Sequence, residues 1–197
     1  MGRKAVISGG KRDEIIAAAR KMFFEKGFDG VTIRTLQKQV GCEVGLFYYY
    51  FKSKDEVFEV VVEQLESEWR SELEAVAEGF DDNPKLCLDR LFEAVSRLAE
   101  QFRREGRKNL HWSVQSGIYD RLIGLAEEFS VQLLESMGAR GFSVKEQAAI
   151  VAGGLGRIAV GENNGNGYKE RIDYVLSAAG IHDYSYNRRR EISVELL

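Results

Sequence analysis

Apolar residues recur at helical spacing along most of this chain. In the first predicted helix, which begins near Lys11 and ends at Gly27, one face carries the apolar residues Ile15, Ala19, Met22 and Phe23. Few stretches alternate with a period of two, and Pro84 is the only proline that could interrupt a helix. The pattern therefore predicts an all-α fold.

Two short helices are expected next. Thr32 is a suitable N-cap for a helix that ends at Val40, where Gly41 stops it. A second short segment, residues 44–51, is apolar and aromatic, and its Phe47 and Phe51 fall on the side expected to face the core.

Longer helices follow these short ones. Ser53 and Glu56 have the spacing of a capping box, in which each side chain bonds a free backbone N–H, and this predicts a helix to about Phe80. The later helices are expected from Leu88 to Phe102, from Ile118 to Met137, from Ser143, which with Glu146 forms a second capping box, to about Val160, and from Tyr168 to Ala179. We therefore expect a first domain over residues 1–52, ordered from about residue 10, a helical domain over 53–181, and a tail over 182–197.

The charges are distributed unevenly along the chain. Its 197 residues carry a net charge of −3, but residues 1–54 hold 11 Lys and Arg against 5 Asp and Glu, whereas residues 55–197 hold 17 against 26. A basic first quarter joined to an acidic remainder indicates a segment that meets phosphate and a body that does not.

Targeting segments and soft metal ligands are scarce. No apolar run reaches the length of a membrane-spanning helix and no secretory segment opens the chain, so we expect a cytoplasmic protein. Cys42 and Cys87 form no Cys-x-x-Cys pair, and His111 and His182 are the only histidines, so neither a metal nor another cofactor is expected. The two thiols are expected to be reduced packing or surface groups, with a redox role for Cys42 as the alternative.

Residues 32–51 have the size of a helix-turn-helix. In that motif one helix lies across the DNA backbone and the second presents residues to base edges in the major groove. Val44, Gly45 and Leu46 are small enough for the second helix to approach the bases closely, and Tyr48, Tyr49 and Tyr50 offer hydroxyl groups to phosphates or bases.

The same segment resembles the DNA-binding signature of the TetR family of transcriptional regulators. The resemblance runs from about residue 11 to 60 and includes Thr32 at the start of the second helix, the Gly41 turn, the run Gly45-Leu-Phe-Tyr48-Tyr-Tyr-Phe51, and the pair Lys54-Asp55. It implies a ligand-responsive regulator, most simply a repressor, that binds a double-stranded DNA operator as a homodimer and carries no enzyme activity.

The resemblance also implies roles for individual residues. Thr32, Tyr48 and Lys54 would contact the DNA backbone, and Arg34 would reach a base or a phosphate. The groove face would consist of Val44, Gly45, Leu46, Tyr49 and Tyr50. Two structural alternatives stay open: Thr32 only caps its helix, and Tyr50 only packs.

Glu43 departs from the family pattern, which often has a small hydroxyl residue before the recognition helix. An acid can cap a helix and complements its dipole, but here it also lies close to phosphates or to cytosine amino groups. Because Val44 and Leu46 are apolar, this helix offers few hydrogen-bond donors to bases. Contacts with thymine methyl groups are therefore expected to matter more.

The second domain is expected to hold a small organic effector and the subunit interface. Candidate pocket residues are the aromatic residues Trp69, Phe92, Phe102, Trp112, Tyr119 and Phe129, with plain core packing as the alternative for most of them. Candidate interface residues are the small-residue stripe and the apolar face of the last helix: Ala149, Gly153, Gly156, Val160, Ile172, Val175 and Leu176. For the stripe, close packing within one subunit is the alternative.

Two other classes of function compete with a regulator. An all-helical enzyme lacks support because the sequence has no recognisable nucleophile–base pair, phosphate loop or metal cluster. A helical adaptor that has lost DNA binding is consistent with the few base donors in residues 44–46, and a salt-dependent DNA-binding assay separates it from a regulator.

Overall fold

The computed structural model describes residues 10–79, 84–106, 109–136, 143–160 and 174–180. In these ranges every regular element is a helix, as the hydrophobic pattern predicts. The helices are α1 (Lys11–Lys26), α2 (Ile33–Val40), α3 (Val44–Tyr50), α4 (Lys54–Ala77), α5 (Pro84–Gly106), α6 (Trp112–Ser136) and α7 (Val144–Val160), and residues 174–178 are also helical. The tail expected from residue 182 lies outside the described residues.

The chain divides into two compact units. The N-terminal unit comprises residues 1–70 and 100–121, and the C-terminal unit comprises residues 71–99 and 122–197. The division therefore does not fall at residue 52: the first part of α4, the end of α5 and the start of α6 belong with α1, α2 and α3. A functional boundary at residue 52 stays a prediction.

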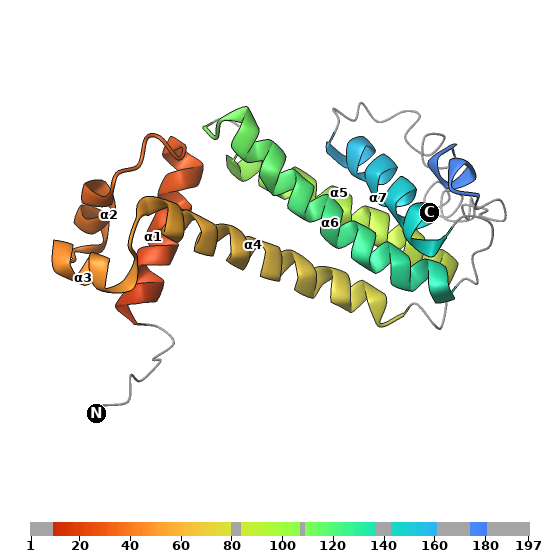
Figure 1. Ribbon diagram of the computed structural model, residues 1–197, viewed down its shortest axis with the longest axis horizontal. Coiled ribbons are helices and arrows are strands. Elements are labelled where there is room, and N and C mark those ends of the chain that lie inside the picture. Colours follow the sequence, from red (N-terminus) through yellow and green to blue (C-terminus); the bar gives the residue numbers. More distant parts are fainter. Residues whose placement is uncertain (1–9, 80–83, 107–108, 137–142, 161–173, 181–197) are drawn as a thin grey trace, which may run out of the picture. The chain divides into compact units, whose positions relative to one another are not determined.

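Aromatic rings form much of the core of the N-terminal unit. In Figure 1, α1, α2 and α3 gather beside the first turns of α4. Phe23 of α1 lies against Phe28 and Phe58, with ring centroids 5.6 and 5.2 Å away. From α3, Phe47 and Phe51 are both buried, as their place in the sequence predicts.

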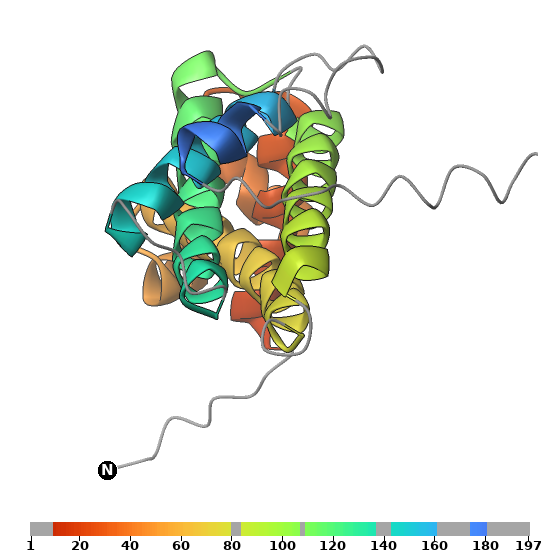
Figure 2. The same ribbon diagram turned by 90° about the vertical axis from the view of Figure 1, so that its right-hand side faces the viewer.

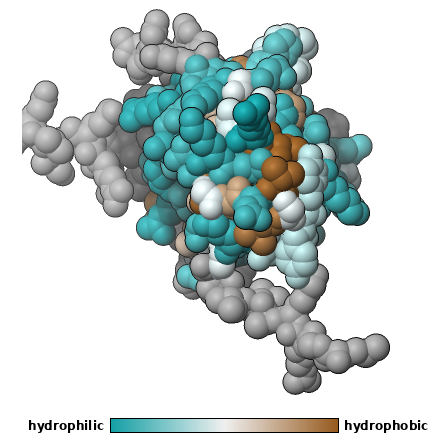
Figure 3. Space-filling view, turned by 90° about the vertical axis from the view of Figure 1, so that its left-hand side faces the viewer, coloured by the Kyte–Doolittle hydropathy of each residue, from teal (hydrophilic) through white to brown (hydrophobic). Residues whose placement is uncertain are grey.

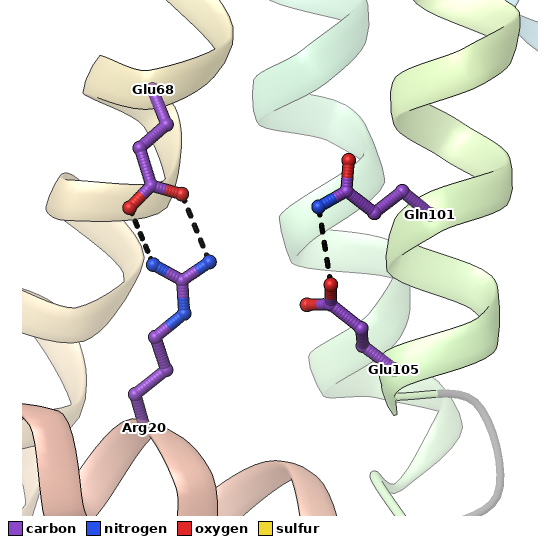
Figure 4. Close-up of polar contacts among 4 residues, drawn as sticks. All are labelled: Arg20, Glu68, Gln101 and Glu105. Atoms are coloured by element: carbon purple, nitrogen blue, oxygen red, sulfur yellow. Dashed lines mark hydrogen bonds and ion pairs between the residues drawn. The ribbon is translucent and has the colours of Figure 1, made fainter.

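Ion pairs tie α4 to two neighbouring helices within this unit. Arg20 of α1 donates to both carboxylate oxygens of Glu68 on α4, with 2.9 Å between Nη2 and Oε2 (Figure 4). The hydrogen bond to Glu68 raises the pKa of Arg20 above its ordinary value, so this charge persists at every working pH. Arg121 of α6 bonds both Glu66 and Glu59 of α4, at 3.0 and 2.9 Å.

The residues between α5 and α6 dock on the end of α1. The Asn109 side-chain amide donates to the Phe24 carbonyl at 3.0 Å, which satisfies a helix-terminal acceptor. Gly27, the C-cap of α1, has a φ of 76°, and a Cβ placed on it would lie 2.2 Å from the Asn109 carbonyl oxygen. Glycine is therefore required at position 27 for two separate reasons.

In the C-terminal unit, α7 packs on α6 through a glycine. Both views show these helices side by side (Figures 1 and 2). A Cβ on Gly156 would lie 2.6 Å from the Ile123 side chain of α6. Gly154 meets Val175 in the same way, and Gln147 donates to the Ala179 carbonyl at 3.1 Å. Small residues on α7 thus allow close packing inside one chain.

The predicted caps are present with one difference. Thr32 caps α2, and Thr35 returns the bond to complete a capping box. Ser53 Oγ accepts from the Glu56 N–H, but the Glu56 carboxylate accepts from Lys52 instead of Ser53.

At α7 the Ser143–Glu146 box is reciprocal. The hydrogen bonds from Ser143 lower the pKa of Glu146, so this contact is present near neutral pH and is lost as the pH falls through that lowered pKa.

Two further findings concern expectations from composition. Among the described residues, none of the helices combines the length and apolarity needed to cross a bilayer. Cys42 is half-buried and Cys87 is buried, and the two are not joined in a disulfide.

We predict that Gly27→Ala lowers the free energy of unfolding more than Gly41→Ala does. Both glycines have positive φ, but an added Cβ at Gly41 meets nothing within 4 Å. Gly41→Ala should therefore cost about 1–2 kcal/mol for the left-handed backbone alone, whereas Gly27→Ala adds a clash with the Asn109 carbonyl. Urea unfolding of both variants measures the difference, and equal losses would contradict the docking of Asn109 on α1.

Candidate nucleic-acid interface

Helix α3 is anchored by one face and exposes the other. Phe47 is fully buried, and the helical period then turns residues 44, 45, 46, 48 and 49 outward. The exposed fractions are 58% for Val44, 36% for Leu46, 53% for Tyr48 and 57% for Tyr49. Figure 3 shows a hydrophobic patch bordered by hydrophilic residues on the side of the molecule where α2 and α3 lie.

Gly45 lies at the middle of this exposed face. At 100° per residue, Val44 and Tyr48 fall on one side of it and Leu46 and Tyr49 on the other. A Cβ placed on Gly45 would meet nothing within 4 Å. The glycine therefore leaves a notch in the surface, with the helix backbone at its floor.

The Glu43 side chain does not cap α3, although an acid at this position can cap a helix. Its backbone has the extended N-cap conformation, but its carboxylate makes no capping hydrogen bond. The capping residues Asp, Asn, Ser and Thr are shorter, and the extra methylene of glutamate carries the carboxylate past the first N–H groups. The Glu43 side chain is exposed beside the groove face.

Two residues with predicted DNA contacts also have local structural partners. Thr32 is exposed, but its hydroxyl already accepts from the Thr35 N–H at 3.1 Å. Tyr50 is half-buried, with its ring 4.9 Å from that of Tyr49. Capping and packing are thus established for these residues, and their contacts to DNA stay predictions.

The basic residues near α2 and α3 fall into two groups. Arg34 and Lys38 of α2, and Lys52 after α3, are exposed. Lys11 and Lys54 are half-buried, and each donates to a backbone carbonyl: Lys11 to Val40 at 3.0 Å and Lys54 to Phe28 at 2.9 Å. The exposed group offers the simpler phosphate contacts.

Lys54 is therefore less of a surface residue than the sequence suggests. Its ammonium lies 3.8 Å from the centre of the Phe28 ring, in addition to bonding the Phe28 carbonyl. No local signal reveals this contact, because the partner lies 26 positions earlier in the chain. Arg12 of α1 makes a similar contact, since its guanidinium lies over the Phe51 ring, 5.3 Å from the ring centre.

The predicted pocket residues are distributed over both units. In the N-terminal unit Phe102 packs edge-on against Trp69 and Tyr119, with centroids 6.1 and 5.1 Å away. Phe92 and Phe129 are buried in the C-terminal unit. Trp112 is different: its side chain is 73% exposed, because it is the first residue of α6 and lies on the surface. Trp112 is therefore not enclosed by the described part of this chain, and a role for it in a ligand pocket stays a prediction.

The predicted interface residues also separate into two kinds. Ala149 is exposed, and a Cβ on Gly153 would meet nothing within 4 Å, so both are accessible to a partner. Gly156, Val175 and Leu176 contribute to packing within the chain instead: Gly156 meets Ile123, Val175 meets Gly154, and Leu176 is 1% exposed. The Val160 side chain and all of Ile172 lie outside the described residues.

Known proteins with a helix-turn-helix match the N-terminal part of this chain. Residues 15–61 match the family described as "Bacterial regulatory proteins, tetR family". The chain is 38% identical over 48 residues to the HTH-type transcriptional repressor AcnR of Corynebacterium diphtheriae, covering 24% of this chain and 25% of that protein. It is 31% identical over 94 residues to the uncharacterized regulator YvdT of Bacillus subtilis, covering 48% of each. These matches span a quarter to a half of the relatives' lengths.

Solved structures show the same fold over most of the chain. A transcriptional regulator of Cytophaga hutchinsonii has a TM-score of 0.59 at 17% identity, covering 88% of this chain and 96% of that one. A TetR/AcrR-family regulator of Thermobifida fusca has a TM-score of 0.54 at 17% identity, covering 89% and 99%.

Helix α2, the tight turn after it and the surface-facing helix α3 form a helix-turn-helix, a motif of DNA-binding proteins. Residues 15–61 match the TetR family, so the helix-turn-helix of this chain is of the TetR type.

We predict that Lys54→Ala lowers the free energy of unfolding by about 1–2 kcal/mol, because it removes a charged hydrogen bond and a cation–π contact from a half-buried position. Lys52→Ala is the matched control, since Lys52 is exposed, and it should change stability by less than about 0.5 kcal/mol. Urea unfolding monitored by circular dichroism measures both. A Lys54→Ala variant as stable as Lys52→Ala would show that the contact with Phe28 contributes nothing.

Proposed function

We propose that this protein is a ligand-responsive transcriptional repressor, released from a palindromic DNA operator by a small-molecule effector. The observation that carries the proposal is the exposed face of α3, which is anchored by buried phenylalanines and flanked by exposed cations. The names of two relatives add support: AcnR is a repressor, and IcaR of Staphylococcus epidermidis, 36% identical over 52 residues, is a negative regulator.

In this mechanism α3 enters the major groove and α2 lies across the backbone. Arg34, Lys38 and Lys52 contact phosphates, together with Thr32 and Tyr48, and these contacts set the affinity for any sequence. The exposed side chains of α3 face the base edges and set the preference. Lys54 bonds the Phe28 carbonyl between α1 and α2 and contributes its charge to the same field.

A homodimer would place two copies of α3 in successive major-groove faces about 34–36 Å apart. The exposed surface of α7 supports such a dimer, since Ala149 and Gly153 allow close approach and Ile150 is 37% exposed. Tyr174 is 77% exposed in the same unit. A two-fold axis through this surface makes the operator an inverted repeat.

The effector would act by linkage. A small organic molecule that binds better to a dimer with wrongly spaced recognition helices weakens operator binding by the same coupling energy. The aromatic residues Phe102, Trp69 and Tyr119 are the candidate contacts in the N-terminal unit, and Phe92 and Phe129 in the C-terminal unit.

The direct test is selection of bound duplexes from a random DNA pool by the purified full chain. The expected product is a sequence with dyad symmetry that is also found upstream of a neighbouring gene. A pool that yields no enriched sequence at low salt would overturn the proposal and favour an adaptor that has lost DNA binding.

We predict that Lys52→Ala and Arg34→Ala each flatten the salt dependence of DNA binding. Each lost phosphate contact should reduce the slope of log K against log salt by about 0.9 per subunit, and specific and non-specific duplexes should be affected alike. Lys21→Ala serves as the control, because Lys21 is an exposed cation on α1. Fluorescence anisotropy between 50 and 200 mM salt, the range over which such contacts are revealed, measures the slopes. Unchanged slopes in both variants would reject this docking of α2 and α3.

We predict a dimer that dissociates when Ala149→Arg is combined with Gly153→Arg. Both positions have space for the new side chain within the monomer, so the arginines should interfere with the partner only. Gly156→Arg is unsuitable, because it would strike Ile123 of the same chain. Light scattering at micromolar concentration gives the mass, with Glu93→Arg on exposed α5 surface as the control. A double variant that stays dimeric would place the interface elsewhere.

A further inference from the structure

The exposed face of α3 lacks hydrogen-bonding side chains at its leading end. Val44 and Leu46 have neither donors nor acceptors, and Gly45 between them has no side chain. Only Tyr48 and Tyr49, one turn later, add a hydroxyl each. A helix that read guanine or adenine directly would carry arginine, lysine, asparagine or glutamine at these positions.

An apolar side chain distinguishes the four bases because it can bury the thymine methyl group but leaves the polar edges of other bases without hydrogen bonds. Thymine is the only base with a methyl group in the major groove, and packing this methyl against valine or leucine removes apolar surface from water on both sides. The same side chains placed against a guanine or cytosine edge would strip water from polar groups and give them no partner. Val44 is 58% exposed and Leu46 36%, so both have surface left to bury.

Gly45 shows that the surface is shaped for close contact. Glycine is less favourable in a helix than every other residue except proline. The fold of this chain does not need it: positive φ among the described glycines occurs at Gly27, Gly41 and Gly180, and a Cβ at position 45 would meet nothing within 4 Å. The backbone of α3 at Gly45 is therefore open to a partner that approaches the helix closely.

We propose that α3 reads thymine methyl groups, with Val44 and Leu46 packing on them and the Gly45 notch allowing the approach. The inference rests on the proposed DNA binding and specifies its chemistry: each half-site presents thymines to the first turn of α3. Electrostatics favour this partner, because exposed Arg34, Lys38 and Lys52 border the helix and supply the phosphate contacts that an apolar reading surface lacks.

The experiment compares the duplex selected from the random pool with duplexes in which single thymines are replaced by deoxyuridine. This replacement removes only the C5-methyl group and keeps the Watson–Crick pair. At each thymine that α3 contacts, the dissociation constant should rise about fourfold, the value expected for one buried methyl group. Thymines outside the half-sites should show no change.

Protein variants then assign the contacts. Val44→Ala should bind the thymine duplex several-fold more weakly and should lose the deoxyuridine effect at one position per half-site, as expected for a coupled pair. Val60→Ala, which removes the same atoms from a half-exposed position in α4, should keep the full deoxyuridine effect. Gly45→Ala should weaken binding to every duplex by tenfold or more, while its urea midpoint stays equal to that of the parent protein or rises.

The outcomes separate this inference from the proposed function. Symmetric, salt-dependent binding that is insensitive to every deoxyuridine replacement would overturn the thymine reading and leave the repressor proposal intact. Half-sites without thymine, or a Gly45→Ala variant that binds DNA as well as the parent, would also overturn it. Absence of any enriched sequence would overturn both.

Discussion

The burial of two phenylalanines holds the rest of the candidate interface in place. Helix α3 has seven residues, a length at which an isolated helix is not stable in water. Phe47 and Phe51 supply the missing stability because both are buried in the N-terminal unit, with their ring centroids 5.9 Å apart. Once they are fixed, the helical period decides which residues face solvent. The exposed apolar face of α3 is thus a consequence of its anchor.

The turns and helix ends near α3 are held by hydrogen bonds from polar side chains to backbone carbonyls. Lys11 satisfies the last carbonyl of α2, Lys54 satisfies the Phe28 carbonyl, and Asn109 satisfies the Phe24 carbonyl near the end of α1. Each contact uses a polar side chain to complete a backbone group that the helices leave open. Cations near α3 therefore have two uses, and exposure separates those that hold the fold from those available to phosphate.

Small residues also have two uses in this chain. Gly154 and Gly156 are small because Val175 and Ile123 occupy the space where a side chain would lie. At Gly45 and Gly153 that space is empty, so the chain itself does not explain the glycine. Open space thus separates the outward-facing glycines, Gly45 on α3 and Gly153 on α7, from the glycines that internal packing requires.

The sequence by itself determined the features that depend on neighbouring residues. The helical period, the Thr32 cap, the Ser143–Glu146 box and the inward side of α3 are all local, so they could be predicted from spacing alone. The tertiary structure decided which side chains meet across long separations. Lys54 and Phe28 are 26 positions apart and Asn109 and Phe24 are 85 apart, and no periodicity encodes such pairs. For the same reason the sequence could not show which small residues of α7 face inward. Only the position of Ile123 shows that Gly156 faces inward, whereas Gly153 stays open.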